Sequence, residues 1–174
     1  PGKYSVEVGL YNSLDQTRLD LLDLPGESRV IVGAVKIAPR QPVVYNPSHL
    51  QRGEFETLAL VGYDVMPTPN PREFRVATYW QARAAMPADY SLFVHALDAR
   101  GEIIAQADHP PQGGNYPTSI WDAGEIVRDE FSITLPPGKF NLEIGWYDLN
   151  TGARLARQDA PGDSITLDTA LEAR

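Results

Sequence analysis

Cysteine is absent from this 174-residue sequence, and histidine and tryptophan occur three times each. Without cysteine the chain has no disulfide, no thiolate metal ligand and no cysteine nucleophile. Apolar runs such as residues 58–63 are far shorter than the roughly 20 residues that a membrane-spanning helix needs. The chain also lacks a Gly-x-Ser-x-Gly elbow, a Walker loop and a Gly-x-Gly-x-x-Gly motif. We therefore expect no enzyme activity in this chain and no cofactor.

Basic residues are outnumbered by acidic ones, 15 to 23, which gives a formal net charge of -8. The lysines and arginines are scattered singly and form no stripe that could follow a phosphate backbone, so nucleic acid is not an expected partner. Hydrophobic residues make up 43% of the chain and charged residues 22%, which is typical of a folded globular protein.

The strongest internal signal is a repeat with a constant offset of 136 residues. Residues 1–11 (PGKYSVEVGLY) match residues 137–147 (PGKFNLEIGWY), and eleven of the first 26 positions are identical to their counterparts. This period exceeds the roughly 20 to 50 residues of a solenoid repeat and corresponds to a whole domain. The sequence therefore predicts tandem copies of one domain.

The repeat divides the chain into three parts. Residues 1–38 are predicted to be the C-terminal strands of a preceding, truncated copy, and residues 54–174 to be a complete copy. Residues 39–53 contain three prolines and little periodicity, which favours a linker. Because the chain begins with Pro1 and no signal-like segment, we expect it to be a fragment of a longer protein.

Within the complete copy, apolar and polar residues alternate with a period of two, as half-buried strands require. About eight short strands follow one another, and no window has a convincing helical stripe. The alternation places these residues in one core between two sheets: Trp80, Val94, Phe131, Leu142, Ile144 and Trp146.

Turn signals separate the expected strands. Residues 98–101 and 150–152 have turn chemistry, and the Pro-Pro-Gly sequence at 136–138 predicts a hairpin between strands 131–135 and 140–146. Regular short strands without helices predict an all-β fold, an antiparallel β-sandwich of the immunoglobulin-like type, with a jelly roll as the alternative.

Several segments of the complete copy resemble a known family. The similarity covers residues 58–155 and rests on these segments: YSLFVHALD at 90–98, AQAD at 105–108, YPTS at 116–119 with Trp121 and Gly124-Glu125, PGKF at 137–140 and GWYD at 145–148. They resemble the soluble C-terminal region of bacterial membrane glycosyltransferases that are similar to dolichyl-phosphate-mannose protein mannosyltransferases. The resemblance implies a non-catalytic extracytoplasmic module, anchored to the membrane only through other parts of its parent protein.

One segment, residues 108–125, is too long for an ordinary hairpin connection, and loops of this length are usually functional or disordered. Its aromatic residues favour an ordered loop. Aromatic faces and polar side chains together suit a sugar, so we expect glycan binding by these residues: Gln112, Asn115, Tyr116, Trp121 and Asp122. In the alternative, Trp121 plugs the end of the sandwich and Tyr116 packs under the loop.

Two chemical alternatives use other residues. A glycoside hydrolase needs paired carboxylates facing one cleft, and the available acids are Asp122, Glu125, Asp129 and Glu130, which more simply are solvated charges. His49, His95 and His109 lack metal-ligand spacing, so no metal is expected, and the DLNTG sequence at 148–152 is a turn rather than a calcium loop.

The N-terminal fragment raises a separate question, since a two-stranded hairpin is marginal in water and its apolar side chains would be left uncovered. These side chains are Tyr4, Val6, Val8 and Leu10. The fragment is expected either to dock on the complete sandwich or to form a homodimer through residues 1–38. A structural spacer in a tandem cell-surface array is the alternative to the glycan-binding module.

Overall fold

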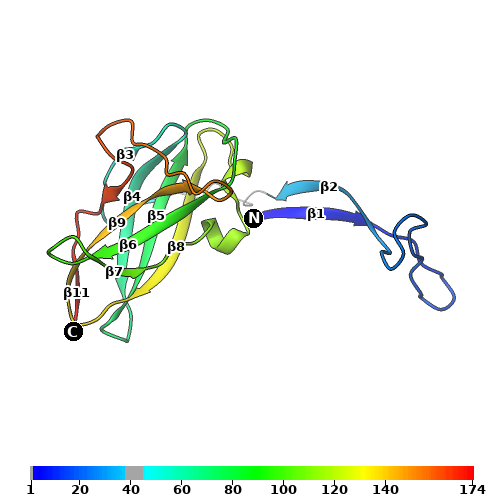
Figure 1. Ribbon diagram of the computed structural model, residues 1–174, viewed down its shortest axis with the longest axis horizontal. Coiled ribbons are helices and arrows are strands. Elements are labelled where there is room, and N and C mark those ends of the chain that lie inside the picture. The colour runs from blue at the N-terminus through cyan, green and yellow to red at the C-terminus, as the bar shows by residue number, and fades with distance from the viewer. Residues whose placement is uncertain (1, 38–44) are drawn as a thin grey trace. The chain divides into compact units, whose positions relative to one another are not determined.

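The computed structural model describes residues 2–37 and 45–174 and contains two compact units, Pro1–Arg40 and Gln41–Arg174 (Figure 1). The first unit is a hairpin of β1 (Gly2–Val8) and β2 (Val30–Ile37). The second is a sandwich of two antiparallel sheets. No helix among the described residues is long and apolar enough to cross a membrane.

One sheet of the sandwich has four strands in the order β3-β4-β5-β8. They are β3 (Gly53–Glu54), β4 (Leu58–Pro67), β5 (Glu73–Ala82) and β8 (Ile126–Thr134). The other sheet has the order β10-β9-β6-β7, and β11 also pairs with β9. Its strands are β6 (Tyr90–Leu97), β7 (Ile103–Gln106), β9 (Gly138–Asp148), β10 (Ile165–Thr166) and β11 (Leu171–Ala173).

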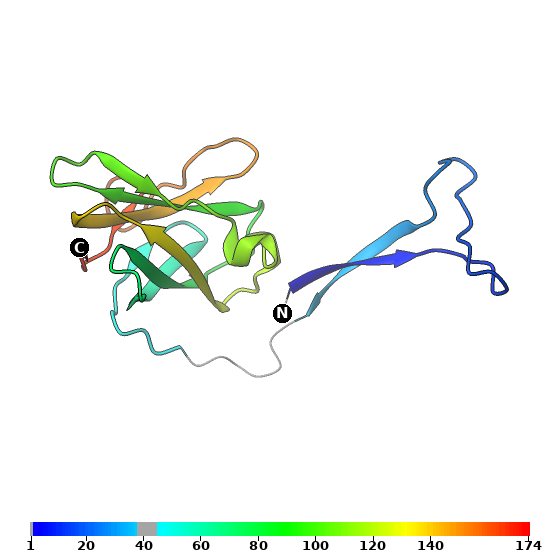
Figure 2. The ribbon, with the colours of Figure 1, turned by 90° about the horizontal axis from the view of Figure 1, so that it is seen from below.

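Figure 2 shows the two sheets as two layers, and their inner faces form a single apolar core. The six core residues expected from the alternation are all buried in it, because in a strand every second side chain points to the same face. Trp80 is fully buried in it, and its ring centroid lies 4.9 Å from that of Trp146 in an edge-on arrangement. The all-β fold and the antiparallel sandwich are confirmed, while the immunoglobulin-like subclass stays a prediction.

The hairpin predicted at residues 136–138 is wrong. β8 pairs with β5 in one sheet, whereas β9 pairs with β6 in the other, so the Pro-Pro-Gly segment carries the chain from one sheet to the other. Turn chemistry marks where a strand ends but does not decide which sheet the next strand joins. The turn at 98–101, in contrast, does join the paired strands β6 and β7, as predicted.

The predicted linker, residues 39–53, is only partly described, because residues 39–44 lie outside the described residues. The rest lies along β4, where the ring of His49 stacks on that of Tyr63 with centroids 4.8 Å apart. The backbone N–H and hydroxyl of Ser48 both donate to Asp64, each at 2.6 Å. Residues 45–53 therefore belong to the structure of the sandwich unit.

Candidate binding site

The long loop between β7 and β8 is ordered and contains two short 3-10 helices, η1 (Pro111–Gly114) and η2 (Thr118–Ile120). Tyr116 and Trp121, the two aromatic residues expected to face a sugar, are each only 2% exposed and belong to the core. The indole N–H of Trp121 donates to the carbonyl of Tyr116 at 2.9 Å, and its ring meets Trp146 edge-on. Both aromatic side chains are therefore packed in the core, as in the alternative in which they do not face a ligand.

The polar residues of the predicted site are spread over the loop. Asn115 and Asp122 are exposed, and Gln112 is half-buried with its side-chain amide donating to the carbonyl of Arg128 at 3.2 Å. Asn115 donates to the carbonyl of Gln112 at 3.1 Å, so these two residues are brought together. Because Tyr116 and Trp121 present no exposed ring face, the loop offers polar groups without an aromatic platform.

A buried ion pair joins this loop to the opposite sheet. Asp129 points into the sandwich, is 1% exposed and accepts hydrogen bonds from Nε2 of His109 at 2.7 Å and from the backbone N–H of Gln112 at 2.8 Å. His109 is bridged to Leu92 of β6, so the pair links the two sheets at one edge. Nδ1 of His109 lies 2.8 Å from the carbonyl of Ala107, and both ring nitrogens therefore face acceptors.

This geometry favours the protonated imidazole. Burial alone would lower the pKa of His109, but the hydrogen bond to Asp129 and its negative charge outweigh burial and raise the pKa above its ordinary value of 6.5. A group that binds its proton more tightly in the folded state stabilises that state only while it is protonated.

We therefore expect the free energy of unfolding to depend on pH through His109. Its contribution is fully present below the unfolded-state pKa of about 6.5 and is lost as the pH rises through the folded-state pKa. Urea titrations from about pH 5 to about pH 9 should show this loss in the native chain and not in the His109→Gln variant. Parallel pH profiles for the two proteins would contradict the assignment.

The carboxylates considered for a hydrolase do not face one cleft. Asp129 points inward, while its neighbour Glu130 lies on the outer face and pairs with Arg75 at 3.3 Å and with Arg128. Glu125 accepts from the Tyr116 hydroxyl at 2.6 Å and from the backbone N–H of Asp122 at 2.9 Å, which ties it to the structure of the loop.

Within residues 2–37 and 45–174, no group of three or more His, Cys, Asp or Glu side chains is placed to hold a metal ion. His95 is buried, with Asp108 and Glu143 at 3.9 and 4.0 Å from its ring nitrogens. Oδ1 of Asp148 accepts from the backbone N–H groups of Asn150 and Thr151 at 2.7 and 2.9 Å, as expected for a turn.

A polar groove that the sequence does not predict lies on the outer face of the four-stranded sheet. The strand register determines which residues form its floor. Glu54 pairs with Ala59, and Ala59 pairs with Gln81, so the three side chains lie in one row across β3, β4 and β5. The short side chain of Ala59 leaves a hollow between two long ones. The groove is lined by Arg52, Glu54, Ala59, Leu60, Val61, Gln81 and Arg83.

A β-bulge shapes the end of this groove. The register between β4 and β5 shifts between Leu60 and Gly62, so Val61 is an extra residue on β4. A Cβ atom at position 62 would lie within 2.8 Å of the Pro47 ring and of the carbonyl oxygen of His49. Residues 47–49 can therefore approach β4 this closely only because position 62 is glycine. A glycine inside a strand often marks a bulge, so Gly62 is the signal in the sequence from which this bulge could be predicted.

The walls of the groove are charged or hydrogen-bonding. Nη1 of Arg83 lies 2.5 Å from Oε2 of Glu54, an ion pair that orients both planar groups at the rim. Gln81 is half-buried beside them and carries both an amide donor and a carbonyl acceptor. Donors and acceptors therefore converge over a small apolar floor, an arrangement suited to a ligand rich in hydroxyl groups.

Comparisons with known proteins assign no family. No protein-family model matches the chain, and no curated protein matches it. Among solved structures, one similar chain is the crystal structure of the C-terminal domain of wzt, with 10% sequence identity and a TM-score of 0.47. The match covers 73% of this chain and 88% of that one. Similarity at this level assigns neither a family nor a function.

Proposed function

We propose that the sandwich is a non-catalytic accessory module that binds or positions a glycan or a glycosylated acceptor through the groove on β3, β4 and β5. The observation that carries this proposal is the row of Glu54, Ala59 and Gln81, in which two hydrogen-bonding side chains flank a short one. Sugar hydroxyls both donate and accept, so a carboxylate, an amide and a guanidinium together match them.

The setting of the module is also a proposal and rests on the resemblance to the soluble C-terminal region of membrane glycosyltransferases. In that setting the module lies on the extracytoplasmic side, and its parent protein provides the membrane anchor and the transferase chemistry. The groove then holds acceptor or product glycan near the membrane. The separate outward and inward positions of Glu130 and Asp129 support a role without catalysis.

Titration calorimetry of the full chain with a panel of neutral and acidic oligosaccharides, mannosides included, tests this function. For an oligosaccharide that binds, Gln81→Ala and Arg83→Ala should each weaken affinity by about tenfold, since each removes a hydrogen bond to the ligand. Ala59→Leu should abolish binding by filling the hollow. Asn115→Ala and Asp122→Ala are matched controls on the loop and should change affinity by less than about twofold.

Two results would overturn the proposal. Binding that is lost in the loop variants and kept in the groove variants would move the site to residues 112–122, as the sequence alone predicts. Absence of binding across the panel would favour the second candidate, a structural spacer in a tandem array. The repeat with an offset of 136 residues supports that second candidate.

A further inference from the structure

The N-terminal hairpin repeats the structure of β9 and its neighbours at the same offset of 136 residues as the sequence repeat. The equivalent strands have equivalent register at their first three pairs. These pairs are Gly2, Lys3 and Tyr4 with Ile37, Lys36 and Val35 in the hairpin, and Gly138, Lys139 and Phe140 with Ala173, Glu172 and Leu171 in the sandwich.

The segment that follows the first strand also has the same backbone contacts in both copies. Tyr11 is bridged to Arg18 as Tyr147 is bridged to Arg154. The backbone N–H of Leu19 donates to the carbonyl of Leu10 at 3.0 Å, and the equivalent bond in the sandwich, from Leu155 to Trp146, is 2.8 Å.

Left-handed backbone occurs at matching positions too. Gln16 has a φ of 61° where Gly152 has 71°, and Gly26 has 89° where Gly162 has 99°. A non-glycine residue with positive φ is uncommon, so its presence at the repeated position marks a shared turn. The two copies differ beyond the bulge between Val6 and Glu7, where Glu7 pairs with Ile31 whereas its counterpart Glu143 pairs with Thr166, a shift of one residue. Apart from this shift, the hairpin has the structure of the equivalent part of the sandwich.

The two copies differ in what covers them. In the sandwich, the inward side chains of β9 and β11 are 0–6% exposed: Phe140, Leu142, Ile144, Trp146, Leu171 and Ala173. Their counterparts in the hairpin are 39–69% exposed: Tyr4, Val6, Val8, Leu10, Val35 and Ile37. One face of the hairpin is therefore an apolar surface of the kind that marks an interaction site.

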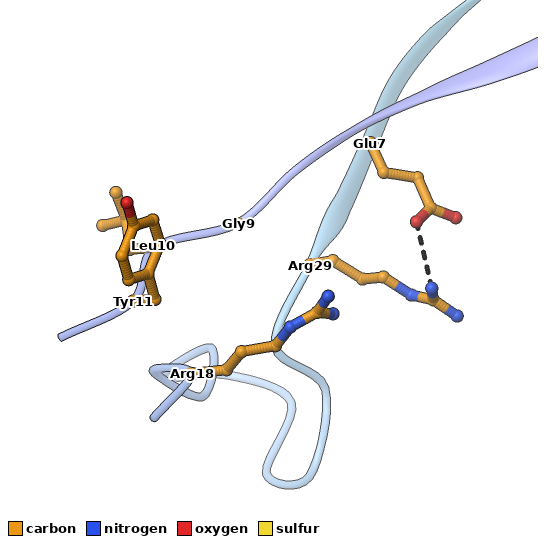
Figure 3. Close-up of a pocket in the computed structure, with 6 residues that line it drawn as sticks. All are labelled: Glu7, Gly9, Leu10, Tyr11, Arg18 and Arg29. Carbon is orange, nitrogen blue, oxygen red and sulfur yellow. Dashed lines mark hydrogen bonds and ion pairs between the residues drawn. The ribbon is translucent and has the colours of Figure 1, made fainter. Parts of the chain in front are cut away.

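The hairpin also carries a pocket, lined by Glu7, Gly9, Leu10, Tyr11, Arg18 and Arg29 (Figure 3). Nη1 of Arg29 lies 3.0 Å from Oε2 of Glu7. Figure 3 shows this ion pair, with the side chain of Arg18 near Arg29. Gly9 and Arg18 are the counterparts of Gly145 and Arg154 at the offset of 136.

In the sandwich those two positions hold an aromatic ring of β6. Cζ of Arg154 lies 4.0 Å from the centroid of the Phe93 ring, and a side chain at Gly145 would come within 2.4 Å of that ring. The pocket on the hairpin therefore has the parts that seat Phe93: an arginine for the ring face and a glycine that lets the ring approach.

We propose that the hairpin is the docking surface for a preceding copy of strands β3 to β8 in the same polypeptide. The strand equivalent to β6 pairs with the open edge of β1, as Val94 of β6 pairs with Ile144 of β9. Its aromatic residue enters the pocket between Gly9 and Arg18, and the sheet equivalent to β3-β4-β5-β8 covers the apolar face. The inference does not depend on glycan binding.

The strand order of the sandwich bears on which copy of the domain can supply the equivalent of β6. β6 lies between β9 and β7 in the strand order, so both of its edges are already paired. A strand equivalent to β6 with one open edge must therefore come from another copy of the domain. The repeat places that copy ahead of the hairpin, since β8 precedes β9 in the complete copy.

An extended chain tests the proposal. Residues 45–136 are duplicated in front of Pro1, so that Pro136 leads into Pro1 as it leads into Pro137. Backbone amides of residues 4–10 should exchange at least about 100-fold more slowly than in the 174-residue chain, because covered strands open far more rarely than fraying ones. Amides of β9 serve as the internal reference.

A matched pair of variants in the extended chain separates docking from a general effect of the added residues. Val6→Asp places a charge on the apolar face and should restore fast exchange, whereas Ser5→Asp lies on the other face and should keep it slow. Equal exchange in the original and extended chains overturns the proposal. Slow exchange of residues 4–10 in the original 174-residue chain also overturns it. If that slow exchange depends on protein concentration, the hairpin forms a homodimer; if it does not, the hairpin docks on the sandwich of its own chain.

Discussion

Replacing Trp80 by alanine is expected to lower the free energy of unfolding of the sandwich by about 3–5 kcal/mol, a large part of the roughly 5–15 kcal/mol that a domain has. The side chain is fully buried and meets Trp146 edge-on, and its ring centroid lies 6.1 Å from that of Phe55. Its indole N–H also donates to Thr78 at 2.9 Å. Alanine loses these contacts and leaves a cavity in the core.

Urea denaturation followed by far-ultraviolet circular dichroism measures this effect. Leu149→Ala is the control, since that side chain is 48% exposed and its loss should change stability by less than about 0.5 kcal/mol. Trp80→Phe fills most of the volume and should fall between the two variants. Equal losses for Trp80→Ala and Leu149→Ala would mean that the two sheets do not enclose one core around Trp80.

Removing His109 should cost about 3 kcal/mol, because His109→Ala leaves the buried carboxylate of Asp129 without its charged partner. The backbone N–H of Gln112 still donates to that carboxylate, but one neutral donor does not compensate for burial. The same substitution releases the contact between the two sheets at this edge and loosens the start of the long loop.

A double-mutant cycle isolates the pair from its surroundings. His109→Ala, Asp129→Ala and the double variant are compared by urea denaturation at about pH 6, and we expect an interaction energy of about 1–3 kcal/mol. Strictly additive losses would show that His109 and Asp129 contribute separately and that the buried pair does not link the sheets.

The sequence predicted much of the fold because alternation reports directly on burial. Every second residue from Phe74 to Trp80 and from Phe140 to Trp146 faces the core, as the pattern indicates. The hairpin at 136–138 was mispredicted because local turn chemistry is the same whether the next strand joins the same sheet or crosses to the other. Sheet membership is decided by long-range pairing, which a single sequence does not display.

The candidate site was harder to predict for the same reason. The groove depends on the register that aligns Glu54, Ala59 and Gln81 across three strands, and these residues are separated by turns and loops in the sequence. Tyr116 and Trp121 were expected to bind a sugar because they are aromatic residues in a long loop, but large aromatic side chains are usually buried, and here both belong to the core. The repeat, in contrast, was visible in the sequence alone.

The most direct test of the proposed function is a map of amide chemical-shift changes in the full chain as an oligosaccharide that binds is added. We expect the changes to cluster at residues 52–61 and 81–83, around the row of Glu54, Ala59 and Gln81, and to leave residues 112–122 nearly unchanged. Chemical-shift changes that cluster on the loop at 112–122 would contradict binding in the groove. So would changes at residues 52–61 and 81–83 that are no larger than the change at His109.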